Sequence, residues 1–258
     1  MDWKKELYDE EERPLDRFVN GISHTSIFRT MAFVGDSLSS GEFESRDPLG
    51  QPGYHDYFEY SWGQYIARKN GLKAYNFSQG GMTAQGYIDW FADQKRYWSP
   101  EMAAQAYVIA LGVNDLFGAK QEIGSVEDID RNNFWNNTQS FIGCYAMIIQ
   151  RYQSIQPRAK FFLVTIPREG DEEDAKRKAH AKALYDLAAY FDNCYVIDLY
   201  QYGPVYDEEF KRHFYLYGHM NASGYIFTAN LIDSYIDYII RKNPEDFRLV
   251  PYIGTGLQ

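Results

Sequence analysis

Five short apolar runs, each followed by a turn and most by a segment with helical spacing, constrain the fold of this chain more than any other feature. Strands of a parallel sheet read as apolar runs, because helices cover both faces of such a sheet. The predicted strands are 30–34, 73–77, 106–111, 161–166 and 195–199. Strand and helix alternating five times predict an α/β fold with a mostly parallel, five-stranded sheet between two helical layers.

The segments between the runs predict the helices and the long loops. Apolar side chains recur at intervals of three and four residues, which indicates helices. These are expected over 61–69, from the turn at Gly81 through Trp90, and over 133–153, 171–191 and 222–241. Residues 38–60 and 117–131 lack this spacing and are expected to be loops. Loops of such length in a compact domain commonly serve a site, so we expect 38–60 to form a pocket wall.

The length of 258 residues favours one domain, because two domains sharing it would each have a small core. We predict a single domain over 1–258, with residues 1–29 as an N-terminal extension and 244–258 as a C-terminal tail. The tail carries apolar residues without a regular period, so it either wraps around the domain or meets a partner subunit. The oligomeric state is left open.

The net charge of −10 argues against nucleic acid and against an anionic membrane as partners, because both attract basic surfaces. A neutral small molecule fits better. The first residues lack the apolar core of a secretory signal, and no run of about 18 apolar residues occurs. We therefore expect a cytoplasmic protein. Its two cysteines, Cys144 and Cys194, have no metal-ligand spacing and are expected to be buried, reduced thiols.

Four residues place complementary chemical groups near the ends of the predicted strands. Ser37 follows the first strand, Gly81 the second and Asn114 the third, while His219 precedes the last helix. Ligands of an open parallel sheet bind outside the carboxyl ends of its strands, where the strand order reverses. With the order 2-1-3-4-5 the three turns are neighbours. We therefore expect the four residues to share one site.

These four groups match the needs of acyl transfer. The hydroxyl of Ser37 can attack a carbonyl carbon if a base removes its proton, and His219 is the candidate base. The oxyanion that forms needs donors already in place. The backbone N–H groups of Ser37 and Gly81 and the side-chain amide of Asn114 are the predicted oxyanion hole.

The same positions lie in sequence blocks that resemble those of a known family. Residues 35–38 read Gly-Asp-Ser-Leu, 76–83 resemble a second block, and 112–115 read Gly-Val-Asn-Asp. With His219 in a last block, the chain is similar to the SGNH hydrolases, also called GDSL lipases or esterases, over residues 31–240. The resemblance implies a flavodoxin-like three-layer α/β/α sandwich, an acyl-enzyme mechanism without cofactor or metal, and ester substrates from lipids to acetylated sugars.

The chain departs from the family pattern around its histidine. The family usually has an aspartate three residues earlier, where this chain has Leu216, and commonly a proline after the histidine, where it has Met220. An orienting carboxylate sets the tautomer of the ring and stabilises its charged form. Three arrangements fit: a Ser–His dyad held by a backbone carbonyl, a triad with another acid, or a site that binds without catalysis. Four acids that precede the histidine are candidates for the third member of a triad: Asp198, Asp207, Glu208 and Glu209. Each of them also fits a solvated loop residue.

We therefore predict a serine esterase that removes acetyl or other short acyl groups from small or carbohydrate substrates, such as an acetylated oligosaccharide. No long apolar helix resembles a lid, which argues against bulk lipid. The alternatives are an acyltransferase of the same mechanism and a catalytically impaired carbohydrate-binding protein. The substrate-binding residues, the acyl chain length and the leaving group are not predicted.

Overall fold

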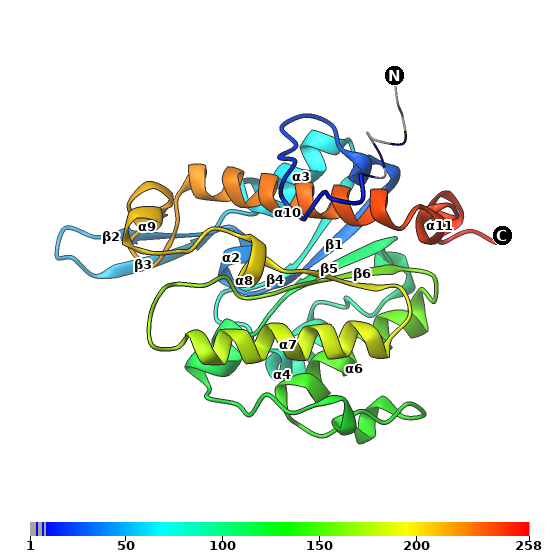
Figure 1. Cartoon of the computed structure of the whole chain (residues 1–258). Coiled ribbons are helices and arrows are strands. Elements are labelled where there is room, and N and C mark those ends of the chain that lie inside the picture. Colours follow the sequence, from blue (N-terminus) through cyan, green and yellow to red (C-terminus); the bar gives the residue numbers. More distant parts are fainter. Residues whose placement is uncertain (1–3, 5–6, 8, 258) are drawn as a thin grey trace.

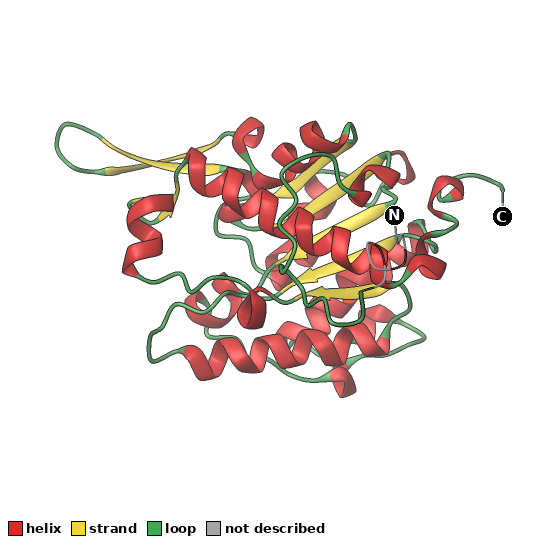
Figure 2. Cartoon of the chain, turned by 45° about the horizontal axis from the view of Figure 1, so that its top comes forward, coloured by secondary structure: helices red, strands yellow, loops and turns green. Residues whose placement is uncertain are grey.

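A five-stranded parallel sheet forms the centre of the computed structural model, which describes residues 4, 7 and 9–257 (Figures 1 and 2). The order along the sheet is β4-β1-β5-β6-β7, so the predicted fold and the strand order 2-1-3-4-5 are confirmed. The observed strands differ from the predicted ranges only by one or two residues at their ends. They are β1 (Thr30–Gly35), β4 (Lys73–Ser78), β5 (Ala106–Ala110), β6 (Lys160–Val164) and β7 (Cys194–Ile197).

Helices cover both faces of the sheet because its strands are apolar on both sides. In β1, Met31 and Phe33 join one buried cluster while Ala32 and Val34 join the other, as the two-residue period of a strand requires. Two helices pack on the first face and two on the opposite face, above and below the sheet in Figure 1. These helices are α3 (Trp62–Asn70) and α10 (Ala222–Lys242), and α6 (Phe141–Ile155) and α7 (Asp174–Tyr190).

Shorter elements connect these layers. The short α-helices are α2 (Ser37–Ser40), α4 (Ala84–Gly86), α5 (Ala92–Gln94), α8 (Leu199–Tyr202), α9 (Glu208–Phe214) and α11 (Pro244–Phe247). The 3-10 turns are His24–Ile27, Phe58–Tyr60, Pro100–Met102, Val126–Asp128, Phe134–Asn136 and Val250–Tyr252, and π-helical turns cover Tyr87–Phe91 and Asn114–Gly118.

The helix predicted over 133–153 begins later than expected. Residues Phe134–Asn136 form only a 3-10 turn, and α6 starts after Ser140, whose hydroxyl accepts from the N–H of Gly143 at 3.1 Å. The side chain of Asn137 accepts from the backbone N–H of Asp130 at 2.8 Å. Polar side chains of this kind offer the backbone alternatives to a helix, which the apolar spacing alone did not reveal.

The predicted loop 38–60 contains a β-hairpin, which corrects the sequence interpretation. Its strands are β2 (Glu42–Arg46) and β3 (Pro52–Asp56), and they project from the body of the molecule (Figures 1 and 2). Glu44 pairs with Tyr54 across the hairpin. The strand was missed because β2 alternates charged residues with others and presents no apolar face of the kind that marks a half-buried strand.

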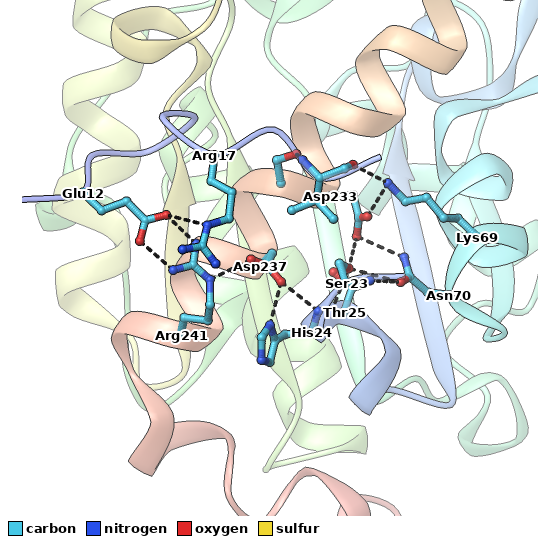
Figure 3. A network of polar contacts seen from close by, with 12 residues as sticks. Glu12, Arg17, Ser23, His24, Thr25, Lys69, Asn70, Asp233, Asp237 and Arg241 are labelled. Atoms are coloured by element: carbon cyan, nitrogen blue, oxygen red, sulfur yellow. Dashed lines mark hydrogen bonds and ion pairs between the residues drawn. The ribbon is translucent and has the colours of Figure 1, made fainter. Parts of the chain in front are cut away.

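A buried polar network fastens the N-terminal segment to α10 (Figure 3). Arg241 binds both carboxylate oxygens of Glu12, at 2.6 and 2.7 Å, and donates through Nε to Asp237 at 2.8 Å. Burial alone would raise the pKa of Asp237, but hydrogen bonds from His24 and Arg241 hold it well below its usual value. A second cluster, one turn earlier, joins the same segment to α3 through Ser23, Asn70, Asp233 and Lys69.

The C-terminal tail packs on its own chain, which is the first of the two predicted alternatives. Phe247, Val250 and Ile253 are buried in the cluster beneath α10 and α3. The side chain of Gln105 donates to the carbonyl oxygen of Val250 at 3.1 Å. Among the described residues, no helix has both the length and the apolar character needed to cross a bilayer.

Candidate active site

Ser37 is the first residue of α2, directly after the carboxyl end of β1. Asp36 caps this helix by accepting from the N–H of Leu38 at 3.1 Å. Gly35 allows α2 to lie close to the end of β1, because a Cβ at residue 35 would be only 2.2 Å from the hydroxyl of Ser39. The short turn therefore sets Ser37 at the edge of the sheet where parallel folds bind ligands.

Asn114 follows β5 and ties the neighbouring turns together. Its Nδ2 donates to the carbonyl oxygen of Met82 at 3.1 Å and lies 3.5 Å from Oδ2 of Asp36. The next residue, Asp115, accepts from the N–H of Ala84 at 2.7 Å. These contacts fix the amide of Asn114 between the first and second turns, so its orientation is set before any ligand arrives.

The two aspartates of these turns are buried, and both are harder to ionise than an exposed carboxyl. Burial, with a smaller contribution from the nearby charge of Asp115, raises the pKa of Asp36 to about 7 against the hydrogen bond from Leu38. Burial likewise raises the pKa of Asp115 to about 6. A partly neutral Asp36 repels a developing oxyanion less than a full carboxylate would.

His219 lies on β9 (His219–Met220), which pairs with β8 (Tyr215–Leu216), and its ring contacts two glutamates of the hairpin. Nδ1 is 3.4 Å from Oε2 of Glu44, and Nε2 is 3.0 Å from Oε1 of Glu42. Because each ring nitrogen contacts one carboxylate, the two glutamates hold the ring of His219 in one orientation.

Glu44 has the environment of an ionised, positioned carboxylate. Its Oε2 accepts from the N–H of Gly218 at 2.9 Å, and its Oε1 lies 2.5 Å from Arg46. Burial alone would raise its pKa, but the hydrogen bonds from Gly218 and His219 and the charge of Arg46 lower it. Glu44 is therefore a carboxylate at neutral pH and can stabilise a positive charge on His219.

The acids expected from the sequence lie elsewhere. No described hydrogen bond or ion pair joins them to His219. Asp198 is buried rather than solvated and bonds Thr165 and Tyr185, while Asp207 caps α9. The other two, Glu208 and Glu209, lie in the exposed first turn of α9. The carboxylate on Nδ1 instead comes from Glu44, 175 residues before the histidine.

Three of the four predicted residues face one cleft of about 400 Å³. Ser37, Asn114 and His219 line it, whereas Gly81 is not one of the described lining residues. Gly81 has the left-handed backbone (φ 72°) that favours glycine, and its place in the oxyanion hole stays a prediction. The described contacts include no hydrogen bond between Ser37 and His219. The buried apolar residues of its lining include Trp62, Val164, Leu199, Met220 and Ile232.

Comparison with solved structures shows the same fold at low identity. A protein from Lactobacillus plantarum is 17% identical, with a TM-score of 0.59 over 81% of this chain and 97% of that one. A carbohydrate esterase family 2 enzyme with a carbohydrate binding domain, from Corynascus thermopiles (Myceliophthora fergusii), is 15% identical, with a TM-score of 0.55 over 88% and 69%. An acetyl xylan esterase is 17% identical, with a TM-score of 0.52 over 79% and 97%.

Comparison of the sequence with family models is more specific. No curated protein matches the chain significantly. Residues 33–226, however, match the model of the GDSL-like lipase/acylhydrolase family. This range is well over half of the chain and includes Ser37, Gly81, Asn114 and His219, the four residues that the motifs single out. The chain therefore belongs to the GDSL-like lipase/acylhydrolase family.

Proposed function

We propose that this protein hydrolyses carboxylic esters through an acyl-enzyme on Ser37, removing acetyl or other short acyl groups from small or carbohydrate substrates. The observation that carries the proposal is the position of His219. It lines the same cleft as Ser37 and Asn114, and a carboxylate, Glu44, lies at its Nδ1. Membership of an acylhydrolase family supports ester hydrolysis as the reaction class.

Each of these groups has a defined role in the proposed reaction, and His219 acts in both steps, first as base and then as acid. Nε2 of His219 takes the proton of Ser37 as its Oγ bonds to the carbonyl carbon, and Glu44 stabilises the imidazolium that results. The N–H groups of Ser37 and Gly81 and the amide of Asn114 hold the oxyanion. The alcohol leaves with the proton from Nε2. Water then attacks the acyl-enzyme by the same route, releasing the acid and restoring Ser37.

The preference for a short acyl group follows from the size of the cleft. Its volume of about 400 Å³ is near the lower end of ligand sites, which span about 300–1,000 Å³. That space must hold the acyl group and part of the alcohol. Carbohydrate substrates are proposed because enzymes named as a carbohydrate esterase and an acetyl xylan esterase share this fold. At such low identity, the fold alone supports this step.

Hydrolysis of p-nitrophenyl acetate, butyrate and octanoate tests the proposal. Ser37→Ala and His219→Ala are expected to lose turnover, while Ser26→Ala, at an exposed serine away from the cleft, keeps it. Turnover is expected to fall as the acyl chain lengthens. Hydrolysis that persists in Ser37→Ala would refute the acyl-enzyme, and a maximum at octanoate would refute the short acyl group.

One contact favours a second candidate, a protein that binds carbohydrate without cleaving it. A carboxylate oxygen of Glu42 contacts Nε2 of His219 at 3.0 Å. A serine hydrolase needs this nitrogen free to accept the proton of its serine. Labelling with a fluorophosphonate separates the two functions, because this probe reacts only with an activated serine. Mass spectrometry that finds the label on Ser37 would exclude the binding-only function. An unlabelled Ser37 in a folded protein would favour it.

A further inference from the structure

We propose that Glu42 selects the alcohol part of the substrate by accepting hydrogen bonds from hydroxyl groups next to the ester oxygen. This inference rests on the proposed ester hydrolysis. It names the alcohol as a neutral polyol or sugar and assigns a residue that recognises it.

The carboxylate of Glu42 is largely enclosed and has one described polar partner, His219. Its Oε1 is 3.0 Å from Nε2 of His219, and its other oxygen lies against Gly80, where a Cβ would be 2.1 Å away. The side chain is 11% exposed, and the described contacts give the carboxylate no polar partner besides His219. A carboxylate offers about four acceptor positions. Several therefore remain for a ligand.

The chemistry of the reaction places the alcohol beside this carboxylate. Nε2 of His219 passes its proton to the leaving oxygen, so that oxygen must come within hydrogen-bond distance of Nε2. Glu42 now lies at that distance from the same nitrogen. It is not among the described residues that line the cleft, whose lining includes buried apolar side chains that suit the acyl group. Glu42 therefore borders the alcohol side of the ester bond.

A substrate must take over the contact that Glu42 makes with Nε2. An alcohol with neighbouring hydroxyl groups offers new donors to the displaced carboxylate. A simple alcohol offers none and leaves a buried charge without a partner, which is costly. The carboxylate of Glu42 is therefore displaced from Nε2 more easily by a hydroxylated alcohol than by a simple one. The site selects substrates by this difference.

The surroundings favour a neutral sugar or polyol over an anionic alcohol. Glu44 and Asp56 both add negative charge near Glu42, and burial raises its pKa, although the charge of His219 opposes this. Two exposed tyrosines border His219: the ring of Tyr54 lies 5.7 Å from its ring, and Tyr217 lines the cleft. Aromatic rings give stiff apolar contact faces, which the C–H face of a sugar can cover.

The test compares two acetate esters that differ only in hydroxyl groups, 1-acetylglycerol and propyl acetate. Glu42→Ala is expected to lower kcat/KM for 1-acetylglycerol about 10- to 100-fold, the effect of losing a hydrogen bond to a charged group. Propyl acetate is expected to be hydrolysed as fast or faster, because Nε2 is freed. The control Glu59→Gln changes an exposed carboxylate and should alter neither rate.

Three results would overturn the proposal. An equal fall for both esters would mean that Glu42 acts on His219 rather than on the alcohol. Unchanged rates for both esters would mean that it recognises neither. Acetylcholine hydrolysed in preference to 1-acetylglycerol, and dependent on Glu42, would mean that the site selects a cation. If Glu42→Ala does not fold, Glu42→Gln, which keeps the volume and loses the charge, takes its place in the comparison.

A binding measurement keeps this inference separate from the proposed hydrolysis. Nuclear magnetic resonance titration of Ser37→Ala with 1-acetylglycerol needs no turnover. Adding Glu42→Ala to that variant is expected to weaken binding about 10-fold or more, while propyl acetate binding stays unchanged. If wild type hydrolyses neither ester, the proposed function fails, yet this titration still decides the role of Glu42. Equal binding by both variants would refute it.

Discussion

Replacing Glu44 by glutamine tests whether a carboxylate from the hairpin completes the catalytic site. The variant keeps the size of the side chain, and its amide oxygen can still accept from the N–H of Gly218, now 2.9 Å from the carboxylate. It removes the negative charge beside Nδ1 of His219. The imidazolium formed during the reaction then has no counter-charge on that side, so kcat should fall while KM changes little.

The distance in the structure sets the expected size of this loss. Nδ1 and Oε2 of Glu44 are 3.4 Å apart, whereas charge-assisted hydrogen bonds are about 2.7–2.9 Å. The effect should therefore be smaller than the roughly 10⁴-fold loss in serine proteases. A hydrogen bond to a charged group contributes about 1.5–3 kcal/mol, which corresponds to a fall in kcat of about 10- to 150-fold.

The assay is steady-state hydrolysis of p-nitrophenyl acetate, with thermal unfolding recorded on the same samples. Asp198→Asn is the comparison, because Asp198 is a buried acid before His219 that contacts Thr165 and Tyr185 instead. A folded Glu44→Gln variant with kcat within about threefold of wild type would refute the reasoning and leave a Ser–His dyad. A larger loss in Asp198→Asn would assign the role to that acid.

Three further predictions concern stability and the oxyanion hole. Arg241→Met should lower the free energy of unfolding in urea by about 3–5 kcal/mol, because it removes the buried cation that Glu12 and Asp237 share. Arg248→Met, at an exposed ion pair, should cost at most about 1 kcal/mol, and equal losses would contradict this. Asn114→Ala should lower kcat about 100- to 1,000-fold with little change in KM, and an unchanged kcat would remove Asn114 from the oxyanion hole. Since burial raises the pKa of Asp36 to about 7, its folded form keeps a proton that the unfolded chain loses near pH 4, so its contribution to stability should decline from about pH 4 to 7. Urea unfolding of Asp36→Asn should show a smaller decline, which ends near pH 6 because Asp115 still titrates there, and a decline equal to that of wild type would contradict this.

The sheet was predictable because each of its strands is a local signal. The run that ends at Ala110 is apolar at every position, and its burial on both faces leaves no other way to place those side chains. The same holds for the turns, where the side chains of Asp36 and Asn76 accept from backbone N–H groups two residues later. Interactions within a few residues can be read from the sequence, since no distant segment decides them.

The late start of α6 marks the limit of the apolar pattern. Phe134 has the spacing of the helix that follows, yet its segment bonds to the loop before it. Asn137 accepts from Asp130 and donates to the side chain of Gln150, so it serves two segments at once. Competition between helical and side-chain hydrogen bonds depends on which partners come near, and the spacing of apolar residues does not contain that information.

The carboxylate at Nδ1 of His219 depends on contacts that no local pattern encodes. Glu42 and Glu44 are two residues apart, so a strand places both on one face, and this is the only signal that the sequence offers. Their meeting with His219 requires the hairpin to fold back against the β8–β9 turn. A carboxylate near Nδ1 stabilises the charged ring whichever element supplies it. Leu216 therefore does not by itself imply a crippled site, because Glu44 offers the charge that an aspartate at that position would have supplied.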